Sequence, residues 1–281
     1  MSDIDSRHDP TASAGRLEQG PLYAGRDLWR LLSLPLLLFL LLPVLAVALR
    51  VSPADLLANL QEPVVLQATA LSLATTLATT FLAILLGTPL AALLARRRLP
   101  FRRLLDSLVD LPLVLPPAVA GVALLMAFGR RGLFGGVLES MGLHIAFTPL
   151  AVILAQLFVA APFYVKAATL GFAAIDSEMK EAAALDGADG LQTFRYVTLP
   201  LAWGALLSGA IMTWTRALGE FGATLIFAGN YPGRTQTMPL AIYIGFELDL
   251  DVALTLSVIL IGTSFLALLL VRGFLNREIT R

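Results

Sequence analysis

Long apolar runs without charged residues constrain this sequence more than any other feature. A helix needs about 20 apolar residues to cross a bilayer core that is about 30 Å thick. Four charge-free runs cover residues 31–49, 63–95, 111–129 and 252–271, and two further apolar runs, about 147–174 and about 199–228, contain Lys166 and the pair Arg216 and Glu220. We therefore expect an all-α, polytopic membrane protein with six transmembrane helices. The second run is too long for one upright span, so we expect it to tilt or to project from the bilayer.

Composition supports a membrane protein and excludes several other classes. Hydrophobic residues make up 57% of the chain and charged residues 14%, against about 25% charged residues in soluble domains. The net charge of zero argues against nucleic-acid binding. The chain has no cysteine, and its two histidines, His8 and His144, lie in a polar tail and a predicted loop. We therefore expect no metal site and no catalytic residues.

The distribution of Lys and Arg predicts the orientation of the spans, because cytoplasmic loops are enriched in both residues. Six spans place both termini on one side, and we expect that side to be cytoplasmic. Residues 1–30 then form a polar cytoplasmic tail, and residues 31–281 form the transmembrane domain. The segments assigned to the inside hold Arg7, Arg16, Arg26, Arg30, Arg96, Arg97, Arg98, Arg102, Arg103, Lys180, Arg195, Arg272, Arg277 and Arg281. The outer loops hold only Arg50, Arg130, Arg131 and Arg234.

Proline and small residues predict local features of the spans. Pro112, Pro116 and Pro117 should bend the cytoplasmic half of the third span, because proline removes a helical hydrogen bond. Pro89 should do the same near the inner end of the second span. In the fifth span, Gly204 and Ser208 lie four apart and Gly209 follows, so this face should allow close packing against another helix.

The segment at about 176–200, between the fourth and fifth spans, predicts a helix on the cytoplasmic surface. Asp176 or Ser177 suits the N-cap, and Glu178 suits the first turn. The residues from Glu181 to Leu185 favour helix, and Gly187 suits a left-handed stop after it. A second short helix can follow Asp189 before Pro200 opens the fifth span.

This segment resembles the EAA motif of ABC importer permeases. The motif has Glu-Ala-Ala, three residues, Gly, nine residues, an aliphatic residue, one residue and Leu-Pro. Every spacing fits, and only Val197 departs from the commoner isoleucine. The matching positions are Glu181, Ala182, Ala183, Gly187, Val197, Leu199 and Pro200. The resemblance implies that these residues, with Asp186, form a coupling helix that docks in a groove of a separate ATPase.

The chain cannot bind ATP through a P-loop, because that motif needs a lysine preceded by glycine. The only lysines, Lys166 and Lys180, follow Val165 and Met179. We therefore expect a transport subunit that is not an enzyme and binds no cofactor. ATP and Mg²⁺ would bind the partner ATPase.

A second stretch, 216–243, resembles the molybdate and tungstate branch of these permeases. The segments FAGN and PGRTQTMPLAIY within this stretch, and FELDLDVAL just after it, are similar to those of that branch. It covers about residues 64–272. The sulfate and thiosulfate branch shares the RA-G-E-G pattern around Arg216 and Glu220 and is the alternative.

The resemblance also implies the partners and the location of the chain. They are a second copy in a homodimer, two ABC ATPase subunits, an extracytoplasmic oxyanion-binding protein and the lipids of a prokaryotic inner membrane. No nucleic acid is expected.

Charged residues in and near the outer half of the spans are the remaining candidates. Arg216 and Glu220 lie four apart, so they share one helix face. They form either an anion path or a salt bridge that shapes an outer gate, and the salt bridge is the favoured alternative. Arg130, Arg131 and Arg234 are candidate contacts for the binding protein or ordinary solvated loop charges. Lys166 is expected to extend toward the cytoplasmic surface.

Three other classes fit less well. Ion-driven carriers usually have 10 or more spans built as repeats. An intramembrane enzyme needs catalytic pairs in its spans, and none is present. A channel leaves the EAA motif unexplained.

Overall fold

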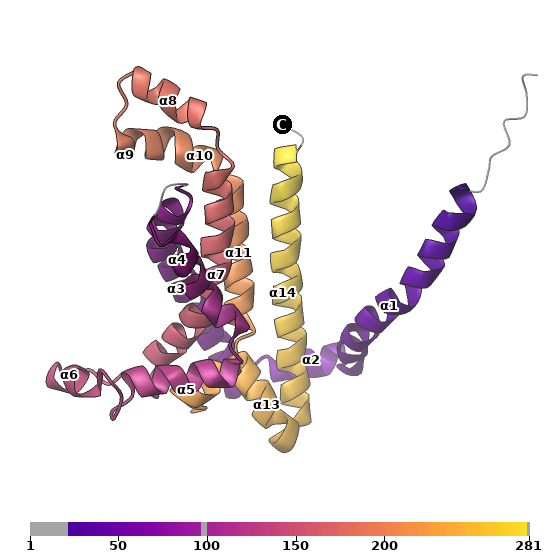
Figure 1. Cartoon of the computed structure of the whole chain (residues 1–281). Coiled ribbons are helices and arrows are strands. Elements are labelled where there is room, and N and C mark those ends of the chain that lie inside the picture. The colour runs from indigo at the N-terminus through magenta and orange to yellow at the C-terminus, as the bar shows by residue number, and fades with distance from the viewer. Residues whose placement is uncertain (1–21, 97–99, 280–281) are drawn as a thin grey trace, which may run out of the picture. The chain divides into compact units, whose positions relative to one another are not determined.

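The computed structural model describes residues 22–96 and 100–279, and every regular element in these ranges is a helix (Figure 1). The chain divides into two units, residues 1–49 and 50–281. The first unit is described by α1 (Leu22–Arg50), which begins inside the stretch predicted to be a tail. Its segment Leu31–Arg50 is long and apolar enough to cross a membrane. The rest of the predicted tail, residues 1–21, lies outside the described residues.

Three helices form the centre of the second unit, namely α3 (Pro63–Leu94), α7 (Pro149–Ala173) and α11 (Trp203–Leu218). Small residues let their backbones approach closely. A Cβ on Gly209 of α11 would lie 2.8 Å from the Cβ of Ala167 on α7. The prediction that this face of the fifth span packs against another helix is confirmed.

Hydroxyl groups on α3 form a buried polar stripe at helical spacing, made of Ser72, Thr75, Thr76 and Thr79. Gln156 of α7 lies opposite and joins two of these residues. Thr79 Oγ1 donates to Gln156 Oε1 at 3.1 Å, and Gln156 Nε2 donates to Thr75 Oγ1 at 3.3 Å. Polar side chains therefore hold α3 and α7 together where water is absent.

The third predicted span is broken more sharply than the prolines suggest. It consists of α4 (Arg102–Val114) and α5 (Pro117–Phe128), which meet at an angle of 114°. Leu115 and Pro116 have extended backbone dihedrals at the break. The predicted bend is confirmed, and α4 and α5 together can form one broken span.

The fifth predicted span is divided into several pieces. It begins with α9 (Gly190–Thr193), a π-helical turn (Phe194–Thr198) and α10 (Leu199–Leu201). A bend of 70° separates these from α11, which ends at Leu218, and α12 (Gly222–Ala228) follows. The prediction of one continuous span over 199–228 is wrong, because helix ends fall at Ala202 and at Gly219.

The other helices complete the second unit. They are α2 (Pro53–Asn59), α6 (Gly135–Ser140), α8 (Ser177–Leu185), α13 (Met238–Leu248) and α14 (Leu250–Ile279). Helix α3 continues through Pro89, so the helix does not end at this proline. In the described ranges, four helices can cross a membrane, or six segments if each bent pair is one span.

The bundle of the second unit has two distinct ends (Figure 1). At one end lie α8, α9 and α10, and α14 ends on the same side. At the other end lie α5, α6 and α13. We call the segment 176–200 the EAA loop and the first of these ends the EAA-loop end.

Candidate coupling and anion-path sites

Helix α8 of the EAA loop is fixed by its own sequence. Asp176 occupies the N-cap position, although its side chain makes no capping hydrogen bond. Glu178 lies in the first turn, where a negative charge favours the helix dipole. The predicted surface helix is therefore present.

Gly187 ends α8 as the sequence predicts. Its φ angle is +89°, a left-handed conformation that glycine adopts without steric cost. The amide of Gly187 donates to Ala184 O at 3.1 Å, and the amide of Ala188 donates to Ala183 O at 2.9 Å. These two bonds are those of a Schellman motif, which satisfies the last carbonyls of a helix.

The second half of the loop has its own stop and start signals. Asp189 and Gln192 form a capping box at the start of α9, with Gln192 N donating to Asp189 Oδ1 at 2.7 Å. Thr198, just before Leu199 and Pro200, is buried, and the π-helical turn places an extra residue there. This turn then leads into the membrane helix.

The outward surface of the EAA loop is apolar and exposed. Leu185 is 88% exposed, Leu191 76% and Tyr196 70%. Glu181, Ala182, Asp186 and Gly187 are exposed beside them, and Ala183 is half-buried. Exposed large apolar residues that lie together are typical of a surface that another protein or a membrane covers.

A cavity of about 390 Å³ lies under this loop, between the loop and the end of α3. Ala92 and Arg96 line it from the α3 side, and Lys180 and Ala184 line it from α8. Open space therefore lies between α8 and the end of α3.

Arg216 and Glu220 lie where α11 ends. Arg216 Nη1 and Glu220 Oε2 are 2.9 Å apart, and the Glu220 side chain is 1% exposed. Glu220 Oε1 also accepts a hydrogen bond of 2.9 Å from Ala223 N, in the first turn of α12. One buried carboxylate therefore joins the end of α11 to the start of α12. The Arg216 side chain is 30% exposed.

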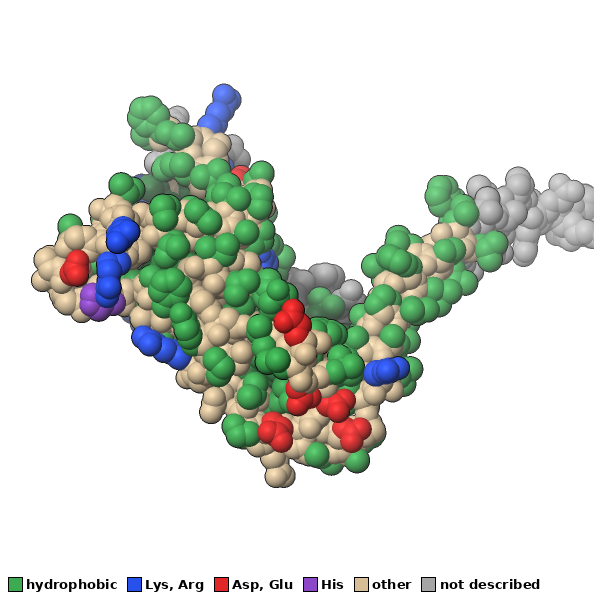
Figure 2. All heavy atoms as spheres, turned by 90° about the horizontal axis from the view of Figure 1, so that it is seen from below, with side chains coloured by type: hydrophobic (Ala, Val, Ile, Leu, Met, Phe, Trp, Pro, Cys, Tyr) green, Lys and Arg blue, Asp and Glu red, His purple; other side chains and the backbone are tan. Residues whose placement is uncertain are grey.

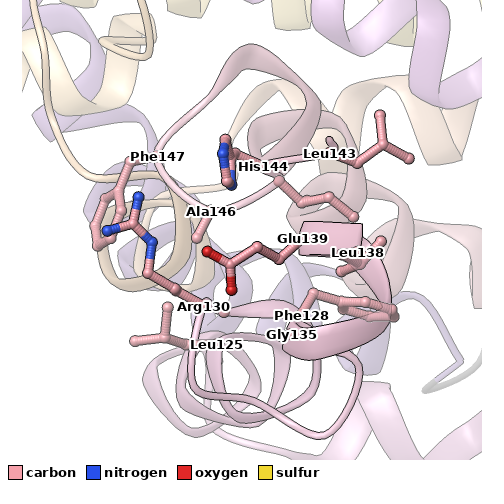
Figure 3. Close-up of a pocket in the computed structure, with 12 residues that line it drawn as sticks. Leu125, Phe128, Arg130, Gly135, Leu138, Glu139, Leu143, His144, Ala146 and Phe147 are labelled. Atoms are coloured by element: carbon pink, nitrogen blue, oxygen red, sulfur yellow. The ribbon is translucent and has the colours of Figure 1, made fainter. Parts of the chain in front are cut away.

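The outer arginines lie on separate elements. Arg130 and Arg131 are exposed in the turn after α5, and Arg234 is exposed between α12 and α13. Arg130 lines a pocket of about 360 Å³ together with Glu139 and His144 (Figure 3). In the part of the chain that the structure describes, Arg130 has no carboxylate partner within ion-pair distance.

Acidic side chains gather on the face opposite the EAA-loop end (Figure 2). Glu247, Asp249 and Asp251 are exposed at the junction of α13 and α14. Our sequence reasoning considered only the basic residues of the outer loops, and it missed these carboxylates. The end opposite the EAA loop therefore carries both acidic and basic side chains.

A second ion pair was missed as well. Lys166 Nζ on α7 donates to Asp110 Oδ2 on α4 at 2.8 Å. The prediction that Lys166 extends toward the membrane surface is wrong, because it bridges two helices instead. No sequence spacing links two residues that are this far apart in the chain.

Comparisons with known proteins agree with this architecture. Residues 83–279 match the family described as binding-protein-dependent transport system inner membrane component. The molybdenum transport system permease protein ModB of Mycobacterium bovis is 42% identical over 246 residues, which cover 86% of this chain and 93% of ModB. The sulfate transport system permease protein CysW of Synechococcus elongatus is 37% identical and covers 66% of this chain and 65% of its own.

A solved structure shows the same fold at low identity. A chain in the crystal structure of a bacterial alginate ABC transporter, in complex with its pentasaccharide-bound periplasmic protein, aligns with a TM-score of 0.70. It is 15% identical and covers 92% of this chain and 96% of that chain. The likeness concerns the fold of the subunit.

Proposed function

The chain belongs to the family of binding-protein-dependent transport system inner membrane components, and we propose that it imports molybdate or tungstate as the permease subunit of an ABC transporter. It is a multi-pass inner-membrane protein and a transport subunit rather than an enzyme. An ATPase and a solute-binding protein are the partners that such a subunit requires.

The choice of solute rests on the relatives. The chain is 42% identical to a molybdenum permease over 86% of its length and 37% identical to a sulfate permease over 66%. Sulfate or thiosulfate import is the alternative, because all four solutes are tetrahedral dianions.

The observation that carries the transport mechanism is the exposed EAA loop. We propose that Glu181, Ala182, Ala183, Asp186 and Gly187 dock on the ATPase, with Leu199 and Pro200 connecting the loop to the bundle. The apolar side chains of Leu185, Leu191 and Tyr196 supply area that the ATPase would cover. ATP and Mg²⁺ would bind only on that partner.

The Arg216–Glu220 pair suits an outer gate better than a tight anion site. Glu220 is buried and has two hydrogen-bonding partners, so it fixes the turn between α11 and α12. It also neutralises most of the Arg216 charge. We propose that Arg216 attracts an oxyanion only weakly, which suits a subunit that must release its solute.

The assembly completes the proposal. Two copies of this chain would pair with two ATPase subunits, and both termini and the EAA loop would face the cytoplasm. Arg130, Arg131 and Arg234 would contact acidic groups of the extracytoplasmic binding protein.

Uptake of labelled molybdate tests the solute. Cells that lack this chain are compared with cells in which it is restored, each with and without excess tungstate or sulfate. We expect restored uptake that tungstate blocks and sulfate does not. Uptake of sulfate without uptake of molybdate would assign the chain to the sulfate branch.

Co-purification tests the coupling. Glu181→Lys reverses a charge on the exposed face of α8, so we expect the permease to stay in the membrane while its ATPase is lost. Normal co-purification and normal uptake by this variant would remove Glu181 from the docking surface.

A further inference from the structure

The ion pair between Lys166 and Asp110 joins α7 to α4 about two helical turns from the EAA-loop end of the bundle. Lys166 is about two helical turns before the end of α7 at Ala173. Asp110 is about two turns after the start of α4 at Arg102. Both residues therefore lie about 10 Å from the EAA-loop end, measured along their helices.

This pair is not enclosed by the chain. The Lys166 side chain is 38% exposed and that of Asp110 is 41% exposed. Ionised side chains at such a depth are costly against lipid, and they face water or protein instead. The exposed side of the pair therefore suits a wet passage or a protein neighbour better than lipid.

The surface of α4 connects the pair to the EAA-loop end. Arg102, Asp106 and Asp110 follow one another at four-residue spacing, so they form one polar stripe along the helix. Arg102 Nε lies 3.6 Å from Asp106 Oδ2. The apolar residues Leu104, Leu108 and Leu111 occupy another face and are exposed. Such a helix suits apolar surroundings on one side and a hydrated passage on the other.

The two intramembrane ion pairs differ in how firmly the acid is held. Glu220 is buried and also bonds the amide of Ala223. Asp110, by contrast, has no hydrogen bond other than the one from Lys166 among the residues that the structure describes. An exposed carboxylate with one partner can exchange that partner for another ion.

From this geometry we infer that Lys166 is an oxyanion contact on the inner half of the transport path, and that Asp110 positions it. The inference rests on the proposed import of a tetrahedral oxyanion. The Lys166 ammonium has three donors, and Asp110 occupies one of them. The others can bond the oxygens of a passing dianion, while the Asp110 charge keeps that binding weak enough for release.

Product inhibition separates this role from a purely structural one. The full transporter is placed in liposomes that enclose the binding protein and labelled molybdate, with ATP and unlabelled molybdate in the bath on the ATPase side. The quantity measured is the bath concentration of molybdate that halves ATP-driven efflux. A charge-assisted hydrogen bond corresponds to about tenfold in affinity or more.

The two variants should shift this concentration in opposite directions. Lys166→Gln removes the cation, so we expect the halving concentration to rise about tenfold. Asp110→Asn frees the Lys166 cation, so we expect the halving concentration to fall about tenfold. Asp106→Asn, on the same stripe but one turn nearer the EAA-loop end, is the matched control and should leave the concentration unchanged. Lys166→Arg retains the charge and should stay within about threefold of the unsubstituted protein.

The outcomes distinguish the two proposals. Efflux of sulfate but not of molybdate by the unsubstituted protein would reject the proposed solute, and the same comparison is then made with sulfate. Normal efflux with no shift in either variant, or with shifts in the same direction, would overturn the role of Lys166. If Lys166→Gln fails to assemble, Asp110→Asn and Lys166→Arg still decide the inference, because both retain the cation.

Discussion

The EAA loop and the α3–α7–α11 interior are stabilised in opposite ways. The loop consists of short helices whose ends are closed by residues next to them, such as Gly187 and the Asp189–Gln192 capping box. The interior consists of long helices whose contacts join residues far apart in the sequence, such as Thr79 and Gln156. The loop exposes apolar side chains, whereas the interior buries polar ones.

This contrast agrees with the proposed docking role of the loop and with the interior of a membrane bundle. A docking surface must keep its shape before its partner arrives, so local hydrogen bonds have to define it. A bundle in lipid gains little from apolar burial, since lipid is as apolar as leucine, so close contacts and hydrogen bonds between helices stabilise it. Substitutions in the loop should therefore affect coupling, and substitutions in the interior should affect stability.

The largest effect should come from Gly187→Asp. An L-residue at a φ of +89° is strained, by about 1–2 kcal/mol for a left-handed helical conformation, and the stop of α8 should shift. We expect the ATPase to be lost on purification and uptake to fall by about tenfold or more. Gly190→Ala is the control, because Gly190 has open space around its Cβ position and starts α9. Equal losses in both variants would contradict a role for the left-handed stop.

The second largest effect should come from Gly209→Leu, which should lower the stability of the α3–α7–α11 interior. The first added carbon alone would lie 2.8 Å from the Cβ of Ala167, and overpacking costs about 1–3 kcal/mol. We expect a lower midpoint of thermal unfolding in detergent. Gly136→Leu, at a glycine of α6 with nothing within 4 Å of its Cβ position, is the control and should unfold at the unchanged midpoint.

A smaller interior effect should follow from Gln156→Leu. The substitution removes the hydrogen bonds to Thr75 and Thr79, which average about 0.6 kcal/mol each between membrane helices. Both threonines keep bonds to backbone carbonyls, so neither is left unpaired. We expect the unfolding midpoint to fall by a few degrees while the ATPase stays bound. Loss of the ATPase at an unchanged midpoint would break the division between the two regions.

The smallest effect should come from Asp189→Ala. Loss of this N-cap costs about 1 kcal/mol of local helix stability, so we expect a modest drop in ATPase retention at high salt. Asp176→Ala is a matched control at the other N-cap of the loop, where the side chain makes no capping bond. Retention that falls equally in both variants would show that charge, rather than capping, controls docking.

The sequence predicted best the parts of the fold that depend on local chemistry. The second span was expected at 63–95, and α3 covers Pro63–Leu94. Gly187 was assigned as a left-handed stop, and its φ angle confirms it. The breaks in the third and fifth spans were underestimated, because proline marks where a helix is weak but does not fix the angle. The orientation of the termini and the residues of the gate and docking surfaces stay predictions.

Apolar length, loop charge and turn residues alone determined the class of this protein. A helix crosses lipid when one stretch of residues is apolar enough, and a helix ends where one or two residues stop it. Both features depend on neighbouring residues, so the sequence alone predicts them. Only the tertiary structure paired Lys166 with Asp110 and showed that Glu220 bonds the start of α12. An ion pair depends on which helices are neighbours, and this arrangement arises from packing over the whole bundle.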